Sequence, residues 1–194
     1  MEIGATKAVQ DRLKTTKIEE SKGASLVFCW DTHLTKIKGR NVLFIVNASN
    51  RYTIAMTDIE PRNWNYYTMY IRSVIHGVMQ EMGYSEDQIG QYFKMSGDTT
   101  VTKTHGRKSV GGINRMVMDA QYFGKKLEKE AKYQWELSKY LNRDICQPEG
   151  FDAYGYPSEL FKIDMERLGI AAKREPAKVI DFAQYIENNC GTND

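Results

Sequence analysis

Short segments with the character of β-strands crowd the stretch from residue 25 to residue 56, and this crowding most constrains the fold. The segments are apolar or alternate between apolar and polar residues, as strands with a buried face do: residues 25–30, 33–37, 42–46 and 51–56. Residues 47–50 suit a turn, because Asn and Ser side chains bond the local backbone. The stretch therefore predicts three or four antiparallel strands joined by short turns.

The residues after this stretch predict helices that pack on the sheet. From about residue 64 to residue 82, apolar side chains recur at helical spacing. Gly83 suits the end of this helix, and Ser85 suits the start of a second helix. Residues 99–104 are β-branched at almost every position and predict one more strand, which returns to the sheet. The expected fold class is α+β, a small antiparallel sheet packed by helices, with a long helix and a C-terminal helical tail.

A long helical pattern without proline covers residues 110–141, with a break expected near Gly124. Residues 142–157 hold two prolines and two glycines and predict a long loop. Two further helices are predicted beyond this loop, over residues 158–168 and 176–187. The expected organisation is an α+β core domain over residues 1–141 and a loop with a helical appendage over residues 142–194.

Charge and hydropathy exclude several classes of protein. The 27 Lys and Arg residues against 25 Asp and Glu residues leave a net charge of +2, which does not fit a strongly basic protein that wraps nucleic acid. No apolar stretch approaches the roughly 20 residues that span a bilayer. The N-terminal residues do not have the pattern of a secretory signal. We therefore expect a cytoplasmic protein that makes no contact with a membrane.

Cysteine and histidine residues give no sign of a disulfide framework or a metal site. The three cysteines are odd in number and widely separated: Cys29, Cys146 and Cys190. Cys29 lies within the strand predicted over residues 25–30 and is expected to be a buried small apolar residue. The three histidines have no metal-ligand spacing, so a zinc site would have to be assembled from scattered positions: His33, His76 and His105. We expect neither a metal nor a cofactor.

The segment of residues 102–114 runs from a strand through a glycine-containing turn into a helix, an arrangement that can bind anions. Four basic residues would add charge for an anion or for nucleic acid: Lys103, Arg107, Lys108 and Arg115. The alternative is purely structural. In that interpretation, Ser109 or a neighbour caps the helix and the glycines allow the helix to approach the sheet closely.

The same segment also carries a resemblance to a known family. Together with Asn47 and Tyr52 of the earlier hairpin, the residues concerned are Thr104, Arg107, Gly111 and Asn114. These residues match positions of two motifs of that family: a Leu-Phe-x-x-Asn hairpin and a Thr-x-x-Asn-Arg-Ser-Val-x-Gly-Ser-Met-Asn turn before a helix. On these residues the chain resembles, over residues 1–123, a bacterial family of small cytoplasmic proteins with a domain of unknown function. The resemblance implies an opening strand and helix and an α+β fold, and it implies no activity.

The sequence holds one candidate catalytic trio and one candidate interface. Ser109, His105 and Asp119 lie in one turn-helix segment, but no nucleophile motif surrounds Ser109, so we expect no catalytic residues. The long loop is rich in Tyr and Gly, and such loops can present aromatic side chains to a partner. The candidate interface residues are Phe151, Tyr154 and Tyr156.

These features favour a non-enzymatic cytoplasmic protein that binds and regulates or inhibits another macromolecule. The expected partner is a protein or a nucleoprotein complex, and a plasmid- or prophage-borne inhibitor of a bacterial defence complex would fit this description. One alternative is direct binding of nucleic acid through the basic turn-helix segment, with a steep dependence on salt. A second alternative is a small enzyme that acts on an anionic or phosphorylated substrate at the same turn.

Overall fold

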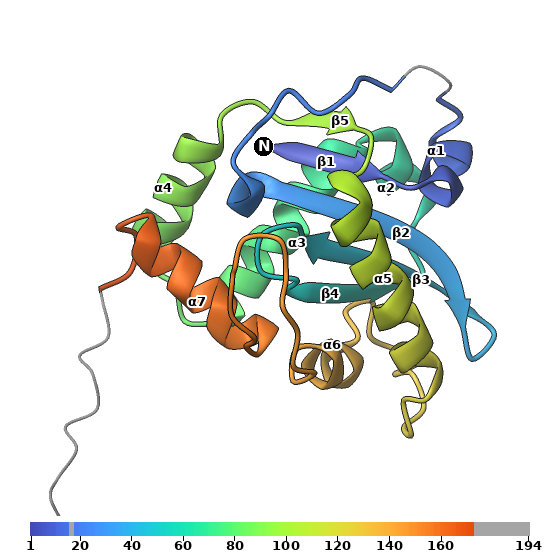
Figure 1. Cartoon of the computed structure of the whole chain (residues 1–194). Helices are drawn as coiled ribbons and strands as arrows, with labels where there is room; N and C mark the ends of the chain where they lie inside the picture. The colour runs from blue at the N-terminus through green and yellow to red at the C-terminus, as the bar shows by residue number, and fades with distance from the viewer. Residues whose placement is uncertain (16–17, 173–194) are drawn as a thin grey trace, which may run out of the picture.

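The computed structural model describes residues 1–15 and 18–172, which form a mixed sheet with helices on both faces (Figure 1). The strands are β1 (Glu2–Ala5), β2 (Cys29–Ile37), β3 (Arg40–Asn47), β4 (Thr53–Thr57) and β5 (Thr100–Thr102). The helices are α1 (Lys7–Leu13), α2 (Pro61–Asn65), α3 (Tyr67–Glu81), α4 (Glu86–Ser96), α5 (Gly106–Gln121), α6 (Trp135–Leu141) and α7 (Pro157–Arg167), with a 3-10 turn, η1, at Leu26–Phe28. The predicted α+β fold class is confirmed.

The five strands lie in the order β4-β3-β2-β1-β5. Strands β2, β3 and β4 form the predicted antiparallel meander, with Asn47 at its second turn accepting backbone N–H groups from Ser49 and Asn50. Strand β1 pairs in parallel with both β2 and β5, so the sheet is mixed rather than purely antiparallel. The predicted return of residues 99–104 to the sheet is therefore confirmed, at the edge beside β1.

Alternation along the strands separates two apolar cores. On β3, Leu43 and Ile45 belong to the larger core, which α3, α4 and α7 complete. The intervening residues Val42, Phe44 and Val46 belong to a smaller core beneath α5 and α6. Figure 1 shows α3 and α5 on opposite faces of the sheet. The smaller core covers β3 and β4, which leaves the part of β1 and β2 under the start of α5 for polar side chains.

The helical pattern predicted over residues 110–141 breaks near Gly124, as expected, but the interruption is longer than a single break and covers residues 122–134. Helix α5 ends at Gln121, and α6 begins at Trp135. Between them the backbone bonds to side chains and to β4 instead of forming a helix. Lys38 Nζ donates to the carbonyl of Lys125 at 2.8 Å, Gln134 Oε1 accepts the N–H of Glu128 at 2.8 Å, and the N–H of Thr57 donates to the carbonyl of Lys132 at 2.7 Å. Phe123 and Leu127 are buried as the apolar spacing predicted, but they lie in an irregular segment that packs on the smaller core.

Residues 142–172 pack directly on the sheet and its helices. Asn142 bonds both the N–H and the C=O of Thr53, at 2.8 and 2.7 Å, and so pairs with the edge of β4. Phe161 of α7 is fully buried in the larger core. The helix predicted over residues 158–168 is present as α7, and the one predicted over residues 176–187 lies outside the described residues. No helix in the described ranges is long and apolar enough to span a bilayer.

Candidate functional site

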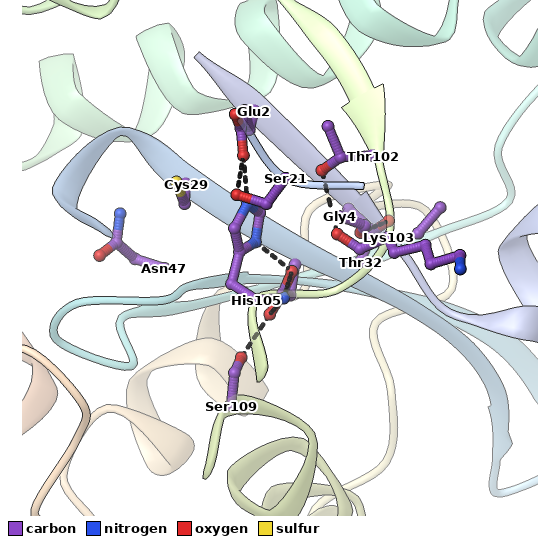
Figure 2. A network of polar contacts seen from close by, with 12 residues as sticks. Glu2, Gly4, Ser21, Cys29, Thr32, Asn47, Thr102, Lys103, His105 and Ser109 are labelled. Carbon is purple, nitrogen blue, oxygen red and sulfur yellow. Dashed lines mark hydrogen bonds and ion pairs between the residues drawn. The ribbon is translucent and has the colours of Figure 1, made fainter. Parts of the chain in front are cut away.

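A buried polar cluster lies where β1 and β2 meet the start of α5 (Figure 2). We define it by its five members: Glu2, Cys29, Asp31, His105 and Ser109. In the parallel pairing of β1 with β2, Glu2 lies opposite Cys29, and Gly4 lies opposite Asp31. Positions two apart on a strand share a face, so all four positions face α5. The register alone therefore groups an acid, a thiol and a second acid on one side of the sheet.

Gly4 makes room for this cluster. A Cβ atom at position 4 would lie 1.8 Å from Oδ1 of Asp31 and 3.0 Å from Cα of Thr104. Any larger residue would collide with the carboxylate and with the backbone that leads into α5. The absence of a side chain at this point of β1 is thus what allows Asp31 to reach the helix start.

Asp31 joins the sheet to the first turn of α5. Its two carboxylate oxygens each accept the backbone N–H of His105 at 3.2 Å, and Oδ2 also accepts the hydroxyl of Ser109. A carboxylate at a helix N-terminus is stabilised by the free N–H groups and by the helix dipole. The N-cap residue is His105 rather than Ser109, and its side chain makes no capping hydrogen bond; the carboxylate that accepts the backbone N–H of His105 comes from β2.

His105 lies between two carboxylates. Its Nδ1 contacts Oδ1 of Asp31 at 2.7 Å, and its Nε2 contacts Oε2 of Glu2 at 3.0 Å. Burial acts to lower the pKa of His105, but its contacts with Asp31 and Cys29 outweigh burial and raise the pKa to about 10. Without a metal, the ring therefore carries a proton on each nitrogen at neutral pH.

Glu2 has further donors from the segment before η1. The hydroxyl of Ser21 donates to Oε2 at 2.6 Å, and the backbone N–H of Lys22 donates to Oε1 at 2.8 Å. Burial acts to raise the pKa of Glu2, yet these hydrogen bonds and the contact with His105 hold it below its usual value. The carboxylate is therefore ionised and fixed in orientation.

The candidate catalytic trio is only partly brought together. Ser109 and His105 are neighbours in the cluster, whereas Asp119 lies about 15 Å further along α5, given 1.5 Å per helical residue, and pairs with Arg115 on the surface. The carboxylate beside Ser109 and His105 is Asp31, which the sequence analysis did not single out. Both ring nitrogens of His105 face carboxylates, so the ring has no free position from which to take a proton from Ser109.

The cluster also contains a set of atoms that can bind a metal. A carboxylate oxygen of Glu2, the Sγ of Cys29 and a ring nitrogen of His105 all lie within 4.8 Å of one another. The sequence offered no ligand spacing because Glu2 and Cys29 are 27 positions apart and Cys29 and His105 are 76 positions apart. Cys29 is buried, as expected, but its neighbours are polar rather than apolar.

The four basic residues of the turn-helix segment do not form one patch of free charge. Lys103 pairs with Glu20, and Arg115 pairs with Asp119 at 3.2 Å. Arg107 and Lys108 are exposed in the first turn of α5, and neither forms an ion pair within the described part of the chain.

The family-motif positions lie around the same helix start. Thr104 precedes the N-cap residue, and Arg107, Gly111 and Asn114 follow one another along the exposed side of α5. Gly111 and Gly112 do not allow α5 to approach the sheet closely, contrary to the structural interpretation. A Cβ at Gly111 would meet nothing, and one at Gly112 would meet the side chain of Arg51.

The candidate interface residues divide between buried and exposed positions. Phe151 is buried beneath Arg167, whose guanidinium carbon lies 4.1 Å from the ring centre. Tyr154 and Tyr156 are 70% and 49% exposed, and Ile145 beside them, which the sequence analysis did not name, is 56% exposed. We call residues 145–156 the tyrosine loop.

Comparison with known proteins identifies a family model that matches the chain. No curated protein and no solved structure matches the chain. A family model described as a domain of unknown function, DUF6933, matches residues 2–160, which extends the resemblance expected over residues 1–123 through α6 and into α7. The match covers most of the chain and includes every member of the buried polar cluster, and the chain therefore belongs to this family of domains of unknown function, DUF6933.

Proposed function

We propose that the protein is a cytoplasmic, non-enzymatic binding protein that recognises another protein through the tyrosine loop. The observation that carries this proposal is the exposure of Ile145, Tyr154 and Tyr156 on one short stretch of loop. Tyr side chains contribute much of the binding energy at protein interfaces, since they bring large apolar area at a small entropic cost.

The anchoring of the tyrosine loop supports this role. Cys146 and Gly155 pair across the loop through two backbone hydrogen bonds of 3.0 and 2.9 Å. The N–H of Gly150 donates to the carbonyl of Ser49 at 2.9 Å, and Phe151 is held under Arg167. The exposed tyrosines are therefore presented by a fixed backbone, so a partner would pay little entropy to order them.

The charge of the tyrosine loop indicates the chemistry of the partner. Glu149 and Asp152 are exposed within the loop, and Asp144 is exposed immediately before it. An acidic and aromatic surface complements an apolar depression rimmed by Lys and Arg. Proteins that bind nucleic acid commonly carry basic surfaces, so a nucleoprotein complex fits as the partner. The proposed role is regulation or inhibition of that complex, and a bacterial defence complex would be one such target.

Replacing Tyr154 and Tyr156 with alanine should abolish capture of the partner from bacterial lysate. Each tyrosine at the centre of such an interface is expected to contribute about 2 kcal/mol. The measurement is affinity capture with the tagged chain, followed by the Kd of the recovered protein for each variant.

Tyr122→Ala is the matched control, because Tyr122 is 80% exposed but lies at the end of α5. Capture that survives loss of both loop tyrosines, or that depends on Tyr122 instead, would contradict the proposal. Recovery of no protein above background would contradict it as well.

Direct binding of nucleic acid is a second candidate, favoured by the exposed cations Arg107 and Lys108 at the start of α5, which have no ion-pair partner among residues 1–15 and 18–172. Each phosphate neutralised contributes roughly 0.9 to the slope of log K against log salt concentration.

A double variant, Arg107→Ala with Lys108→Ala, should therefore lower that slope by about 2 in oligonucleotide binding. Lys7→Ala, which removes an exposed and paired lysine on α1, should leave the slope unchanged. An absence of binding at low salt would exclude this candidate.

A further inference from the structure

Three metal-binding atoms converge inside the molecule, on the face of the sheet beneath α5. The register of β1 and β2 sets Glu2 beside Cys29, and the turn into α5 brings the ring of His105 against both (Figure 2). One oxygen, one sulfur and one nitrogen lie within 4.8 Å of one another, and all three residues are buried. This set of atoms lies at another place in the fold from the tyrosine loop, and neither proposal depends on the other.

We propose that Glu2, Cys29 and His105 bind one zinc-type divalent cation. Thiolate and imidazole ligands favour Zn²⁺ and its neighbours, whereas Ca²⁺ and Mg²⁺ prefer shells made entirely of oxygen. A carboxylate beside a thiolate and an imidazole is compatible with Zn²⁺, whose coordination by proteins uses all three ligand types.

The contacts behind the three ligands are those that metal sites require. Nδ1 of His105 donates to Asp31 at 2.7 Å, which fixes the ring and directs Nε2 toward Glu2. Carboxylate–histidine pairs of this kind orient the ligand and raise its basicity in metal proteins. Asp31 is in turn held by Ser109 and by the N–H of His105, and the second oxygen of Glu2 is held by the N–H of Lys22.

The spacing of the ligand atoms suits a single ion. Ligands at about 2.0–2.3 Å from a tetrahedral Zn²⁺ lie roughly 3.3–3.8 Å from one another. Nε2 of His105 and Oε2 of Glu2 are 3.0 Å apart, and one ligand atom from each of the three residues lies within 4.8 Å of the other two. Side-chain rotations that move these atoms by about an ångström would therefore form the shell, without a change in strand register.

Binding of the ion displaces two protons from the ligand residues. The thiol proton of Cys29 and the proton between Nε2 of His105 and Glu2 leave to solvent, while the Nδ1 proton stays on the hydrogen bond to Asp31. The charge of the ion then replaces the positive charge of the doubly protonated ring. The two carboxylates thus keep a cationic partner in both states.

The fourth position of a tetrahedral shell falls to solvent. No fourth Asp, Glu, Cys or His side chain of the described residues belongs to the group. Ser21 and Lys22, which cover Glu2, are themselves exposed, so solvent lies directly beyond this segment. Three protein ligands with one exchangeable position distinguish this shell from closed structural zinc sites.

Cobalt titration of the metal-free chain tests the proposal. The chain is freed of metal with a chelator, the chelator is removed, and Co²⁺ is added under reducing conditions. We expect saturation at one ion per chain, with a thiolate-to-cobalt charge-transfer band and the strong visible bands of tetrahedral Co²⁺. Stoichiometric Zn²⁺ should displace the cobalt and abolish these bands.

Variants then assign the ligands. Cys29→Ser should remove the charge-transfer band and weaken Zn²⁺ binding by about 100-fold or more, and His105→Gln should weaken binding similarly. Cys146→Ser, which changes the other described cysteine, should keep both the band and the affinity. Alkylation of the wild-type chain, read peptide by peptide, adds a measurement that needs no variant, because Zn²⁺ should protect Cys29 selectively.

Two results would overturn the assignment. One is a wild-type chain that binds no Co²⁺ or Zn²⁺, with equal alkylation of Cys29 in the presence and absence of metal. The other is a charge-transfer band that survives in a folded Cys29→Ser chain and disappears in Cys146→Ser. In either case, the cluster would bind no metal, and the doubly protonated ring of His105 would be the cation that pairs with Glu2 and Asp31.

Discussion

Replacing Asp31 with asparagine should lower the free energy of unfolding by about 3–5 kcal/mol, the cost of removing one partner from a buried charged pair. The side chain of Asp31 is fully buried and accepts hydrogen bonds from the N–H and Nδ1 of His105 and from Ser109. An asparagine has one accepting oxygen, so its NH₂ group would face a donor. The His105 ring would keep only Glu2 as a counter-charge.

The measurement is urea unfolding at neutral pH with a chelator present, so that bound metal does not enter the comparison. Asp119→Asn is the matched control, because Asp119 is on the same helix as Ser109 but pairs with Arg115, whose side chain is 70% exposed. That substitution should cost less than about 1 kcal/mol. Equal unfolding midpoints for the Asp31→Asn chain and the wild-type chain would show that the buried polar cluster does not stabilise the fold.

The cluster could be predicted from the sequence only where its members are neighbours in the chain. His105 and Ser109 stood out because they lie in one turn-helix segment with basic residues around it. Glu2, Cys29 and Asp31 did not, since their relation to His105 depends on the parallel pairing of β1 with β2 and β5. One signal was present: Asp31 directly follows the apolar residues 25–30, and a carboxylate continuing a buried strand requires a buried partner.

The fold was predictable where local periodicity reflects burial. The antiparallel meander and α3 and α4 were found because each has one face in a core and a turn or cap at its end. The helical pattern expected through residue 141 is interrupted over residues 122–134 for the converse reason. Phe123 and Leu127 have helical spacing and are buried, yet hydrogen bonds from Lys38 and Gln134 stabilise an irregular backbone there. Apolar spacing reports burial, and burial alone does not specify a helix.

Replacing Phe161 with alanine should lower the free energy of unfolding by about 3–5 kcal/mol, as expected for an aromatic side chain removed from a packed core. The ring of Phe161 contacts Trp30 of β2 and Tyr52, with ring centres 6.2 and 5.2 Å away. Ile163→Ala on the same helix is the matched control; Ile163 is 36% exposed, and its loss should cost less than about 1 kcal/mol.

If α7 and the sheet form one cooperative unit, urea unfolding of the Phe161→Ala chain will remain a single transition at a lower midpoint. A cost below 1 kcal/mol, or a separate early transition, would instead make residues 142–172 an independent appendage. The tyrosine loop lies between α6 and α7, so this measurement also tells whether its exposed tyrosines are held rigidly for a partner.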